Sequence, residues 1–576
     1  MMWKDKFEEW QLNQTLAARY KEQLASLVND KDKEEHFDGY LSFGTGGMRG
    51  ELGVGTNRIN EYTIKRVALG LAKYVIESNG KEKGVVISYD NRHFSKEFAE
   101  WTACVLASYD IKVFLSDQLR PTPELSFMVR LFQAFAGVMI TASHNPKEYN
   151  GFKVYGADGG QITLETADRL AAILATMTNE LAIQTDSLPN YLLSKQIQYV
   201  GEEMDEQYLR NITEVIQNKQ QVKQSGGGLS IVYTPLHGAG NQLMQKALEH
   251  VGFSQVHVVA EQSVPDPNFS TVLSPNPEDP NAFELAIKAA NSYEGKIIFA
   301  TDPDADRLGA VVMREGKPNL LNGNQIGVLL LDYLIKEKQR QGHSLTDYFI
   351  AKTIVTSDLG EKIANQYGIE TRNTLTGFKF IGEQIQQSEE KQDKEFLLGY
   401  EESYGYLIAP FVRDKDAIQS AVLLAEIALD CKLNNQDLID RLDRIAEEFG
   451  YYQEYLETVS FTGKDGLKAM NQQLEFFRTH PFEKLGSFQL LSKEDYLVSE
   501  SCDSSGLITP LSLPKSNVLK YRFTDGSWIC LRPSGTEPKF KIYYSVNAKT
   551  EEASRNNLSQ LKDAFSYLIE KSDSIY

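Results

Sequence analysis

Short apolar segments that alternate with longer amphipathic ones constrain the fold of this chain more than any other feature. Residues 85–89 (Val-Val-Ile-Ser-Tyr) predict a buried strand, residues 95–108 a helix and residues 111–115 a second strand. A strand, helix and strand in this order predict a βαβ unit, and therefore a parallel sheet covered by helices. The order recurs later in the chain, with strands expected at 229–233, 296–300 and 349–355 and helices expected up to about 251 and over 359–367.

The chain has 576 residues, which is too many for one hydrophobic core. Residues 1–38 predict helices, with Trp3, Phe7 and Trp10 spaced along one face. The C-terminal part predicts short antiparallel strands at 519–523, 527–531 and 539–546, followed by a charged amphipathic helix over about 551–571. We therefore expect three α/β domains and a smaller C-terminal α+β domain, with the ranges 1–205, 206–322, 323–449 and 450–576.

The charge balance excludes some classes of partner. The chain carries 60 basic and 79 acidic residues, a formal net charge of −19, so neither a nucleic-acid nor an anionic-membrane partner is expected. The four cysteines, Cys104, Cys431, Cys502 and Cys530, form no C-x-x-C pair, which favours a reducing compartment. The charged N-terminus does not resemble a signal peptide, and the longest apolar run, 326–335, is interrupted by Asp332. These features predict a cytoplasmic protein.

The stretch Thr141-Ala142-Ser143-His144-Asn145-Pro146 follows the apolar run 137–140, where a buried strand would end. Loops at strand ends carry the chemistry of open α/β sheets. This loop brings a hydroxyl, an imidazole and, with Lys153, an ammonium within about a dozen residues of sequence. Taken alone, the stretch is more typical of a polar turn, with Asn145-Pro146 as the turn element, and no G-x-S-x-G motif surrounds Ser143.

The stretch Thr301-Asp302-Pro303-Asp304-Ala305-Asp306-Arg307 lies between two predicted strands. In an extended segment, Asp302, Asp304 and Asp306 would point the same way and could hold one cation. Oxygen ligands alone suit Mg²⁺ or Ca²⁺. An EF-hand is excluded, because Arg307 and Met313 occupy the positions that need Gly and Glu. A solvated acidic turn is the alternative.

Four further stretches carry polar groups suited to phosphate or sugar binding. Residues 43–50 form a Gly-rich turn that presents Arg49, and residues 376–380 place Lys379 between aromatic residues. Residues 399–406 set Glu401 and Ser403 among tyrosines, an arrangement that can hold sugar hydroxyls, although paired glutamates are often only solvated. Residues 532–539 combine Arg532, Ser534, Gly535 and Thr536, which could bind phosphate as a concave nest or form an ordinary turn.

Together, and in this order, these stretches resemble the α-D-phosphohexomutase superfamily, from Phe43 to about Val546. Residues 376–379, 401–405 and Arg413-Asp414-Lys415-Asp416 look most like the branch that contains bacterial phosphoglucomutases and the phosphoglucomutase-2/phosphopentomutase proteins. The resemblance implies four domains, three of them α/β with mixed sheets, around one central cleft. It also implies interconversion of α-D-glucose 1-phosphate and glucose 6-phosphate through a bound glucose 1,6-bisphosphate.

The resemblance also implies roles for individual residues. Ser143 would be the phosphoserine and would bind Mg²⁺ together with Asp302, Asp304 and Asp306, while Arg49 and Arg307 would add fixed positive charge. Lys153 and Lys379 are the candidate proton-transfer groups, with His144 beside the nucleophile; a lysine acting so at neutral pH needs a depressed pKa. The substrate-binding residues would be Arg307, Thr376, Gly377, Glu401, Ser403, Arg532, Ser534, Gly535 and Thr536.

Three other functional classes share some features with this chain. A haloacid-dehalogenase mutase usually carries its D-x-D-x-[TV] stretch near the N-terminus, whereas here the aspartates lie in mid-chain. A metal-dependent phosphatase would differ only by admitting water, and an inactive sugar-phosphate-binding protein would have lost the residues present here. Phosphomannomutase or phosphopentomutase activity is the alternative specificity. A monomer and a weak homodimer fit the sequence equally well.

Overall fold

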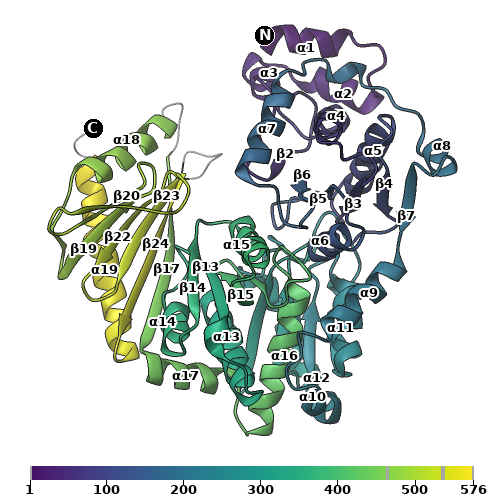
Figure 1. The fold of residues 1–576 in the computed structure, drawn as a ribbon. Helices are drawn as coiled ribbons and strands as arrows, with labels where there is room; N and C mark the ends of the chain where they lie inside the picture. Colours follow the sequence, from purple (N-terminus) through teal and green to yellow (C-terminus); the bar gives the residue numbers. More distant parts are fainter. Residues whose placement is uncertain (1–2, 462–465, 534–538, 574–576) are drawn as a thin grey trace. The chain divides into compact units, whose positions relative to one another are not determined.

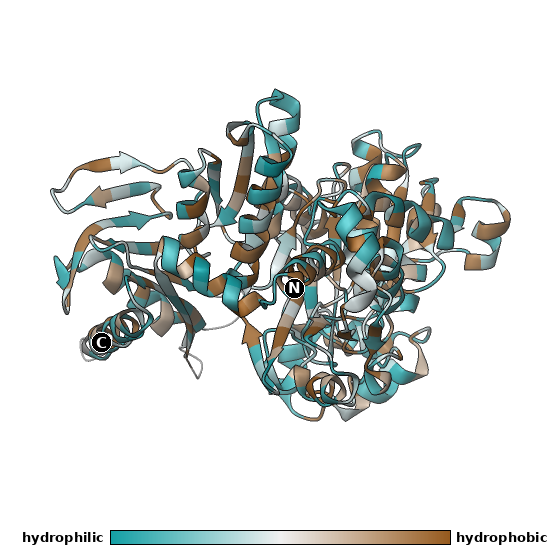
Figure 2. Ribbon diagram, turned by 90° about the horizontal axis from the view of Figure 1, so that it is seen from below, coloured by the Kyte–Doolittle hydropathy of each residue, from teal (hydrophilic) through white to brown (hydrophobic). Residues whose placement is uncertain are grey.

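The computed structural model describes residues 3–461, 466–533 and 539–573 (Figure 1). The chain forms two compact units. Unit 1 comprises Met1–Phe349 and Phe378–Asn435, and unit 2 comprises Ile350–Gly377 and Gln436–Tyr576. Along both, helices and strands mix hydrophilic and hydrophobic residues (Figure 2). Among the described residues, none of the helices is long and apolar enough to cross a membrane.

The N-terminal segment of unit 1 is helical, as the sequence predicts. Trp10 is fully buried and packs edge-on against Phe37 and Tyr62, so these helices have a small aromatic core. Asn29 caps the third helix by accepting a hydrogen bond from the backbone N–H of Asp32. The three helices are α1 (Trp3–Leu12), α2 (Ala18–Ser26) and α3 (Asp30–Phe37).

A seven-stranded mixed sheet follows, with the strand order β1-β2-β6-β5-β3-β4-β7. The predicted βαβ unit is confirmed, because β3 and β4 pair in parallel and α5 connects them. The strand β5 is buried along its whole length and ends at Ile140, directly before the predicted serine loop. Its strands are β1 (Phe43–Gly44), β2 (Gly47–Glu51), β3 (Val85–Tyr89), β4 (Val113–Ser116), β5 (Ala136–Ile140), β6 (Tyr149–Tyr155) and β7 (Ile197–Val200). The helices of this region are α4 (Glu61–Glu77), α5 (Ser95–Ala107), α6 (Thr122–Leu131), α7 (Leu164–Ala175), α8 (Leu188–Leu193), α9 (Glu202–Ile212) and α10 (Lys219–Ser225).

A five-stranded sheet with the order β12-β11-β10-β8-β9 forms the next part of unit 1. The buried strand β10 pairs in parallel with β8 and antiparallel with β11. The turn between β10 and β11 therefore carries the three predicted aspartates at the end of the central strand of this sheet. The elements are β8 (Ile231–Thr234), α11 (Asn241–Val251), β9 (Val256–Val258), α12 (Glu284–Tyr293), β10 (Ile297–Thr301), β11 (Leu308–Arg314) and β12 (Lys317–Leu321).

The remainder of unit 1 contains the predicted sugar loop between two antiparallel strands, β15 and β16. Its helix α16 is almost entirely buried, and its first turn is capped by Asp416. The elements are α13 (Gly323–Arg340), α15 (Phe378–Lys391), β15 (Glu395–Glu401), β16 (Gly405–Leu407) and α16 (Ala417–Leu433). Short 3₁₀ helices of unit 1 lie at Glu180–Ala182, Gly226–Gly228, Ala260–Gln262, Pro280–Phe283 and Leu345–Asp347.

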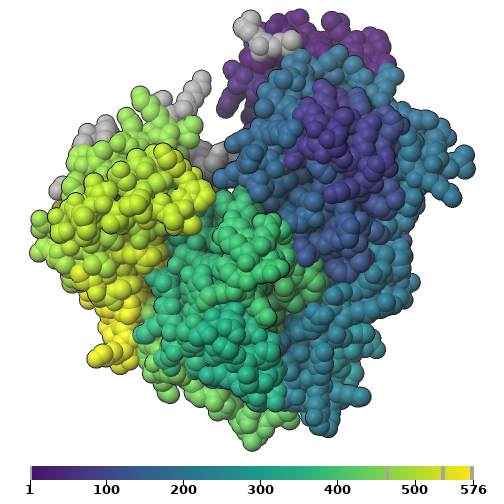
Figure 3. Space-filling view, viewed as in Figure 1, coloured from purple at the N-terminus to yellow at the C-terminus, as the bar shows by residue number. Residues whose placement is uncertain are grey.

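Unit 2 is built on an antiparallel sheet with the order β17-β24-β23-β22-β19-β20-β21. The three predicted C-terminal strands are confirmed as β22, β23 and β24, and the predicted final helix is α19, drawn in yellow at the surface of the unit (Figure 3). The elements are β13 (Tyr348–Thr353, of which the first two residues belong to unit 1), α14 (Leu359–Gln366), β14 (Glu370–Thr374), α17 (Leu438–Phe449), β17 (Tyr451–Ser460), α18 (Gly466–Thr479), β18 (Lys484–Leu485), β19 (Phe488–Asp495), β20 (Glu500–Asp503), β21 (Ile508–Pro510), β22 (Leu519–Phe523), β23 (Trp528–Pro533), β24 (Lys539–Ala548) and α19 (Glu551–Asp573).

Candidate active site

The serine loop begins where β5 ends. Ser143 is buried and has a φ of 51°, in the left-handed region of the backbone. Its own N–H donates to Thr141 Oγ1 at 2.8 Å, which closes a tight turn. A non-glycine residue holds this backbone conformation only where its surroundings fix it. The loop is therefore a constrained structure and differs from the solvated polar turn that the sequence alone left possible.

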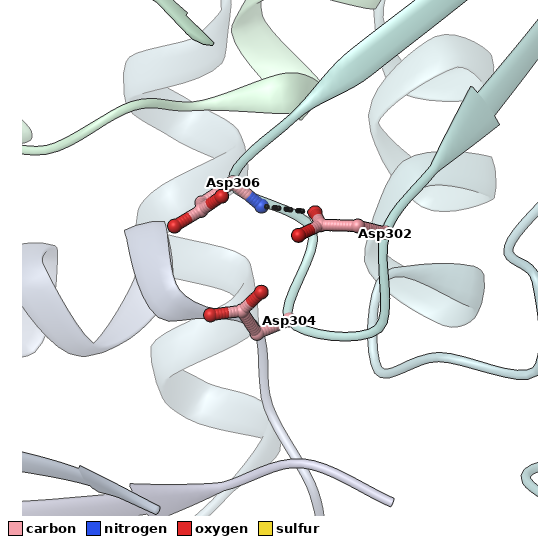
Figure 4. A group of neighbouring side chains, drawn as sticks. All are labelled: Asp302, Asp304 and Asp306. Carbon is pink, nitrogen blue, oxygen red and sulfur yellow. Dashed lines mark hydrogen bonds between the residues drawn. The ribbon is translucent and has the colours of Figure 1, made fainter. Parts of the chain in front are cut away.

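The acidic loop is a tight turn, so the predicted extended segment is wrong. Asp302 Oδ1 accepts hydrogen bonds from the N–H groups of Asp306 (3.2 Å) and Arg307 (3.0 Å), and Ala305 has a φ of 51°. Side-chain to backbone bonds of this kind replace extended structure. The predicted convergence is nevertheless present, because the carboxylates of Asp302, Asp304 and Asp306 surround one space (Figure 4) and offer ligand atoms within 4.8 Å of one another.

The two loops meet through one hydrogen bond. Ser143 Oγ donates to Asp302 Oδ2 at 2.7 Å, and His144 Nδ1 lies 3.1 Å from the same hydroxyl. Burial, together with the cationic Arg307 and Arg49, holds the pKa of His144 well below its usual value. The imidazole is therefore neutral at pH 7, and the serine hydroxyl lies between a neutral ring and a carboxylate.

The aspartate cluster fits a divalent cation. All three carboxylates are buried, and Oδ1 of Asp304 and Oδ1 of Asp306 have no hydrogen-bond partner among the described residues. Burial and the charges of Asp304 and Asp306 raise the pKa of Asp302 well above its usual value, so the negative charge at Asp302 is not fully offset. Buried acceptor oxygens without donors are the ligands of a hard cation such as Mg²⁺.

Neighbouring groups orient Asp304 and compensate part of the charge. Thr122, the first residue of α6, donates its N–H to Asp304 O at 2.9 Å and its hydroxyl to Asp304 Oδ2 at 2.8 Å. Lys153 Nζ lies 2.7 Å from Asp304 Oδ2 and 3.4 Å from Asp306 Oδ2. Burial alone would lower the pKa of Lys153, but these two carboxylates outweigh it and raise the pKa. The depressed pKa expected for a proton-transfer lysine is therefore not found at Lys153.

The two predicted arginines differ in their surroundings. Arg49 lies within β2, opposite Gly151 of β6, and not in a flexible turn as predicted. Its side chain is exposed and donates to Asn145 Oδ1 at 2.8 Å, so it reaches the serine loop. Arg307 is paired with Glu278. Burial would lower the pKa of Arg307, but Glu278 and the aspartates raise it.

The predicted sugar loop and Lys379 are also in unit 1. Glu401 ends β15 and is buried, Ser403 is half-buried in the following turn, and the carbonyl of Tyr404 accepts a hydrogen bond from Leu308 N at 3.0 Å. The sugar loop therefore contacts the strand that follows the aspartates. Lys379 Nζ donates to Thr45 O at 2.7 Å, and burial lowers its pKa.

The other predicted residues belong to unit 2 or lie outside the described residues. Thr376 and Gly377 are half-buried, and Gly377 has a φ of 121°, which favours glycine. Arg532 is in β23, opposite Lys541 of β24. Ser534, Gly535 and Thr536 lie outside the described residues.

Comparison with known proteins assigns the family. Four domain models of one family match consecutive parts of the chain. They are Phosphoglucomutase/phosphomannomutase alpha/beta/alpha domain I (residues 40–181), domain II (206–316), domain III (322–448) and the C-terminal domain (489–558). A protein of Staphylococcus epidermidis named phosphoglucomutase is 40% identical over 530 residues, which are 91% of this chain and 94% of that protein. The chain belongs to the phosphoglucomutase/phosphomannomutase family.

A second relative agrees with this assignment, and one solved structure shares the fold. A phosphoglucomutase of Staphylococcus aureus strain USA300 is 39% identical over 541 residues, 93% of this chain and 94% of that protein. The open-form crystal structure of parafusin, a phosphoglucomutase from Paramecium, has a TM-score of 0.68 at 18% identity and covers 92% of this chain and 95% of that chain. The resemblance and the four-part family architecture expected from the sequence are thereby confirmed.

Lys415 is a further charged residue of the site, and no role could be assigned to it from the sequence. Its ammonium lies 3.0 Å from Asp306 Oδ2 and 3.0 Å from Asp414 Oδ1. Asp414 also accepts a hydrogen bond from the hydroxyl of Tyr155 at 2.9 Å. Burial would lower the pKa of Lys415, but Asp306 and Asp414 raise it, so it is a cation beside the cluster. The only sequence feature that could have indicated this role is the charged stretch Arg413-Asp414-Lys415-Asp416 before the apolar helix α16.

Proposed function

We propose that this protein reversibly interconverts α-D-glucose 1-phosphate and glucose 6-phosphate through a phosphoserine at Ser143. The observation that carries the proposal is the buried Ser143 hydroxyl, 2.7 Å from Asp302 in a cluster of carboxylates suited to a cation. A hydroxyl nucleophile beside such a cluster suits phosphoryl transfer. Relatives about 40% identical over most of the chain are named phosphoglucomutase, which supports glucose as the sugar.

The chemistry follows from the groups around the serine. The Oγ–P bond of phosphoserine breaks while the same phosphorus bonds to a sugar hydroxyl, whose proton passes to a base. Reversing the step with the other phosphate of glucose 1,6-bisphosphate restores phosphoserine and releases the isomeric monophosphate. Asp302, Asp304 and Asp306, with the serine phosphate, would hold Mg²⁺, which when bound offsets charge on the phosphoryl oxygens.

Roles for the surrounding residues are part of the proposal. Arg49 and Arg307 supply positive charge near the serine, and the neutral His144 hydrogen bonds at its hydroxyl. Of the two candidate lysines, Lys379 is favoured as the base because burial lowers its pKa, whereas two carboxylates raise that of Lys153. Glu401 and Ser403 would bind the hydroxyls of the substrate. Its non-reacting phosphate would be bound by Arg532, Ser534, Gly535 and Thr536. Arg307, Thr376 and Gly377 are further candidate substrate-binding residues.

Several properties of the whole protein are also proposed. Glucose 1,6-bisphosphate serves as intermediate and activator, and the four domains span 1–205, 206–322, 323–449 and 450–576. A cytoplasmic location is supported by the four cysteines, all free thiols. We expect sugar phosphates as the only partners of the site, and a monomer or a weak homodimer.

The test is a comparison of substrates with the purified full-length chain. kcat/KM is measured with Mg²⁺ and a trace of the matching sugar bisphosphate, on α-glucose 1-phosphate, mannose 1-phosphate and ribose 1-phosphate. We expect glucose to be preferred at least about tenfold, which corresponds to roughly 1.4 kcal/mol of transition-state binding. A preference for mannose or ribose would replace the sugar but keep the mechanism. Release of inorganic phosphate without isomerisation would contradict the proposal.

A further inference from the structure

Arg92 donates more hydrogen bonds to the serine loop, residues 141–149, than any predicted site residue that the structure describes outside that loop. It follows β3, and its side chain is completely buried. Its guanidinium donates to the carbonyl oxygens of Ser143 (2.6 Å), Pro146 (2.8 Å) and Tyr149 (3.1 Å). It also donates to the carbonyl of Asn145. One side chain therefore donates hydrogen bonds to four carbonyl oxygens of the loop that carries Ser143.

The surroundings of Arg92 fix its guanidinium. Asp90 Oδ2 lies 3.6 Å from Arg92 Nε, and Asp90 Oδ1 accepts hydrogen bonds from the N–H of Arg92 and the hydroxyl of Ser95. The buried ring of Phe269 lies 5.1 Å from the guanidinium, an arrangement typical of a cation–π contact. The guanidinium is planar and has several N–H donors. Because it lies against both the Asp90 carboxylate and the Phe269 ring, it can hold four acceptors in one geometry.

The loop needs such support, because Ser143 adopts a left-handed backbone conformation that is unfavourable for a non-glycine residue. Arg92 binds the carbonyl of Ser143, while the hydroxyl of the same residue faces Asp302. Fixing the carbonyl fixes the backbone from which the Ser143 side chain projects toward Asp302. We propose that Arg92 is a positioning residue that holds Ser143 in line for phosphoryl transfer; this inference rests on the proposed function.

The inference predicts a specific kinetic signature. The four hydrogen bonds that the Arg92 guanidinium donates all end on residues 143–149, so its loss should leave substrate affinity largely intact. A displacement of about 1 Å at a reacting group can cost roughly 100-fold in rate. We therefore expect Arg92→Ala to lower kcat about 100-fold while KM changes less than about threefold.

Arg66 provides a matched control. It is also a buried arginine of the same region, and it donates to two carbonyls, Met177 O at 2.9 Å and Leu174 O at 2.7 Å. Its guanidinium likewise stacks on a ring, that of Tyr40, at 3.8 Å. None of these groups belongs to the serine loop. Arg66→Ala should therefore lower the melting temperature as Arg92→Ala does, without a comparable loss of kcat.

The experiment compares Arg92→Ala, Arg92→Lys and the same two changes at Arg66, all in the full-length chain. Melting temperature, kcat and KM are measured, and the extent of Ser143 phosphorylation by glucose 1,6-bisphosphate is followed by intact mass. We expect slower phosphorylation in both Arg92 variants and partial recovery of Arg92→Ala in tens of millimolar guanidinium, which refills the lost donors. Equal losses of kcat at Arg66 and Arg92 for equal losses of melting temperature would overturn the proposal.

A second readout is independent of sugar turnover. Amide hydrogen exchange is compared between the wild type and Arg92→Lys, the variant more certain to fold. Faster exchange confined to residues 141–149 is expected, and unchanged protection there would overturn the positioning role. If the wild type isomerises no sugar phosphate, the proposed function fails, whereas the exchange result still decides whether Arg92 holds the loop.

Discussion

Ser143 and Asp302 are 159 positions apart in the chain, yet the hydroxyl of the serine donates to the carboxylate of the aspartate across 2.7 Å. They lie in different family domains, at residues 40–181 and 206–316. The candidate nucleophile and the candidate cation ligands are therefore brought together by the packing of two sheets, each of which presents a turn at a strand end. The position of either loop alone does not define the site.

Replacing Ser143 by Ala should abolish turnover, because Ser143 supplies the hydroxyl that donates to Asp302 among the described residues. We expect kcat to fall at least about 1,000-fold, and incubation with glucose 1,6-bisphosphate to add no mass to the protein. Ser108→Ala, a change at the end of α5, is the control and should keep wild-type activity. Near-normal turnover by the Ser143 variant would remove the phosphoserine from the mechanism.

Magnesium should stabilise the protein through the aspartate cluster. Three buried carboxylates repel one another, and a ligand at 100 times its Kd adds about 2.7 kcal/mol to the free energy of unfolding. We expect millimolar Mg²⁺ to raise the melting temperature of the wild type by roughly 2–4 °C relative to EDTA. Asp306→Asn should lose most of this rise, and the exposed Asp110→Asn should retain it. An identical melting temperature of the wild type with and without Mg²⁺ would argue against the cation site.

Gly238 should be intolerant of a methyl group. A Cβ there would lie 2.5 Å from Pro303 Cα and 2.6 Å from Pro303 O, in the backbone of the aspartate turn. The turn must then shift, so Gly238→Ala is expected to raise the Mg²⁺ concentration for half-maximal activity about tenfold and to cost about 1–3 kcal/mol. Gly228→Ala, where a Cβ meets nothing within 4 Å, is the control. Equal Mg²⁺ requirements for the two variants would refute the packing argument.

Glu426 should make stability pH-dependent. Burial raises its pKa from 4.5 to about 7, although it accepts hydrogen bonds from the N–H groups of Gln217 and Asn218. The folded state therefore holds this proton more tightly than the unfolded state, so the stability it contributes is full below pH 4.5 and is lost as pH rises to about 7.

In thermal or urea unfolding, the stability of the wild type relative to Glu426→Gln should fall by roughly 3 kcal/mol over that range. Glu206→Gln, a change at an exposed side chain, should show the same dependence of stability on pH as the wild type. A constant difference between the wild type and Glu426→Gln would show that the carboxyl titrates normally.

The sequence predicted the candidate site best where polar residues directly follow a buried strand. The buried strand β5 and the residues after it could be predicted, because an apolar run followed by polar residues marks the edge of a sheet. The identity of the three aspartates could be predicted as well, but their turn could not, since it depends on Asp302 accepting backbone hydrogen bonds from Asp306 and Arg307. Local bonds of that kind leave no periodic signal.

Residues whose role depends on tertiary contacts were missed. Lys415 becomes part of the site only because folding brings it to Asp306, more than a hundred positions earlier. The strand β17 was also missed, because its ten residues are all at least partly exposed and show no alternation of apolar and polar side chains. Arg92 left a weaker trace, as a polar residue directly after β3.

The positive φ of Ser143 has a consequence for the choice of amino acid at this position. Threonine would offer the same hydroxyl, and it serves as a nucleophile in other enzymes. A second substituent on Cβ makes the left-handed backbone region an outlier for β-branched residues, however. The loop therefore selects serine over threonine on conformational grounds, before any question of reactivity arises.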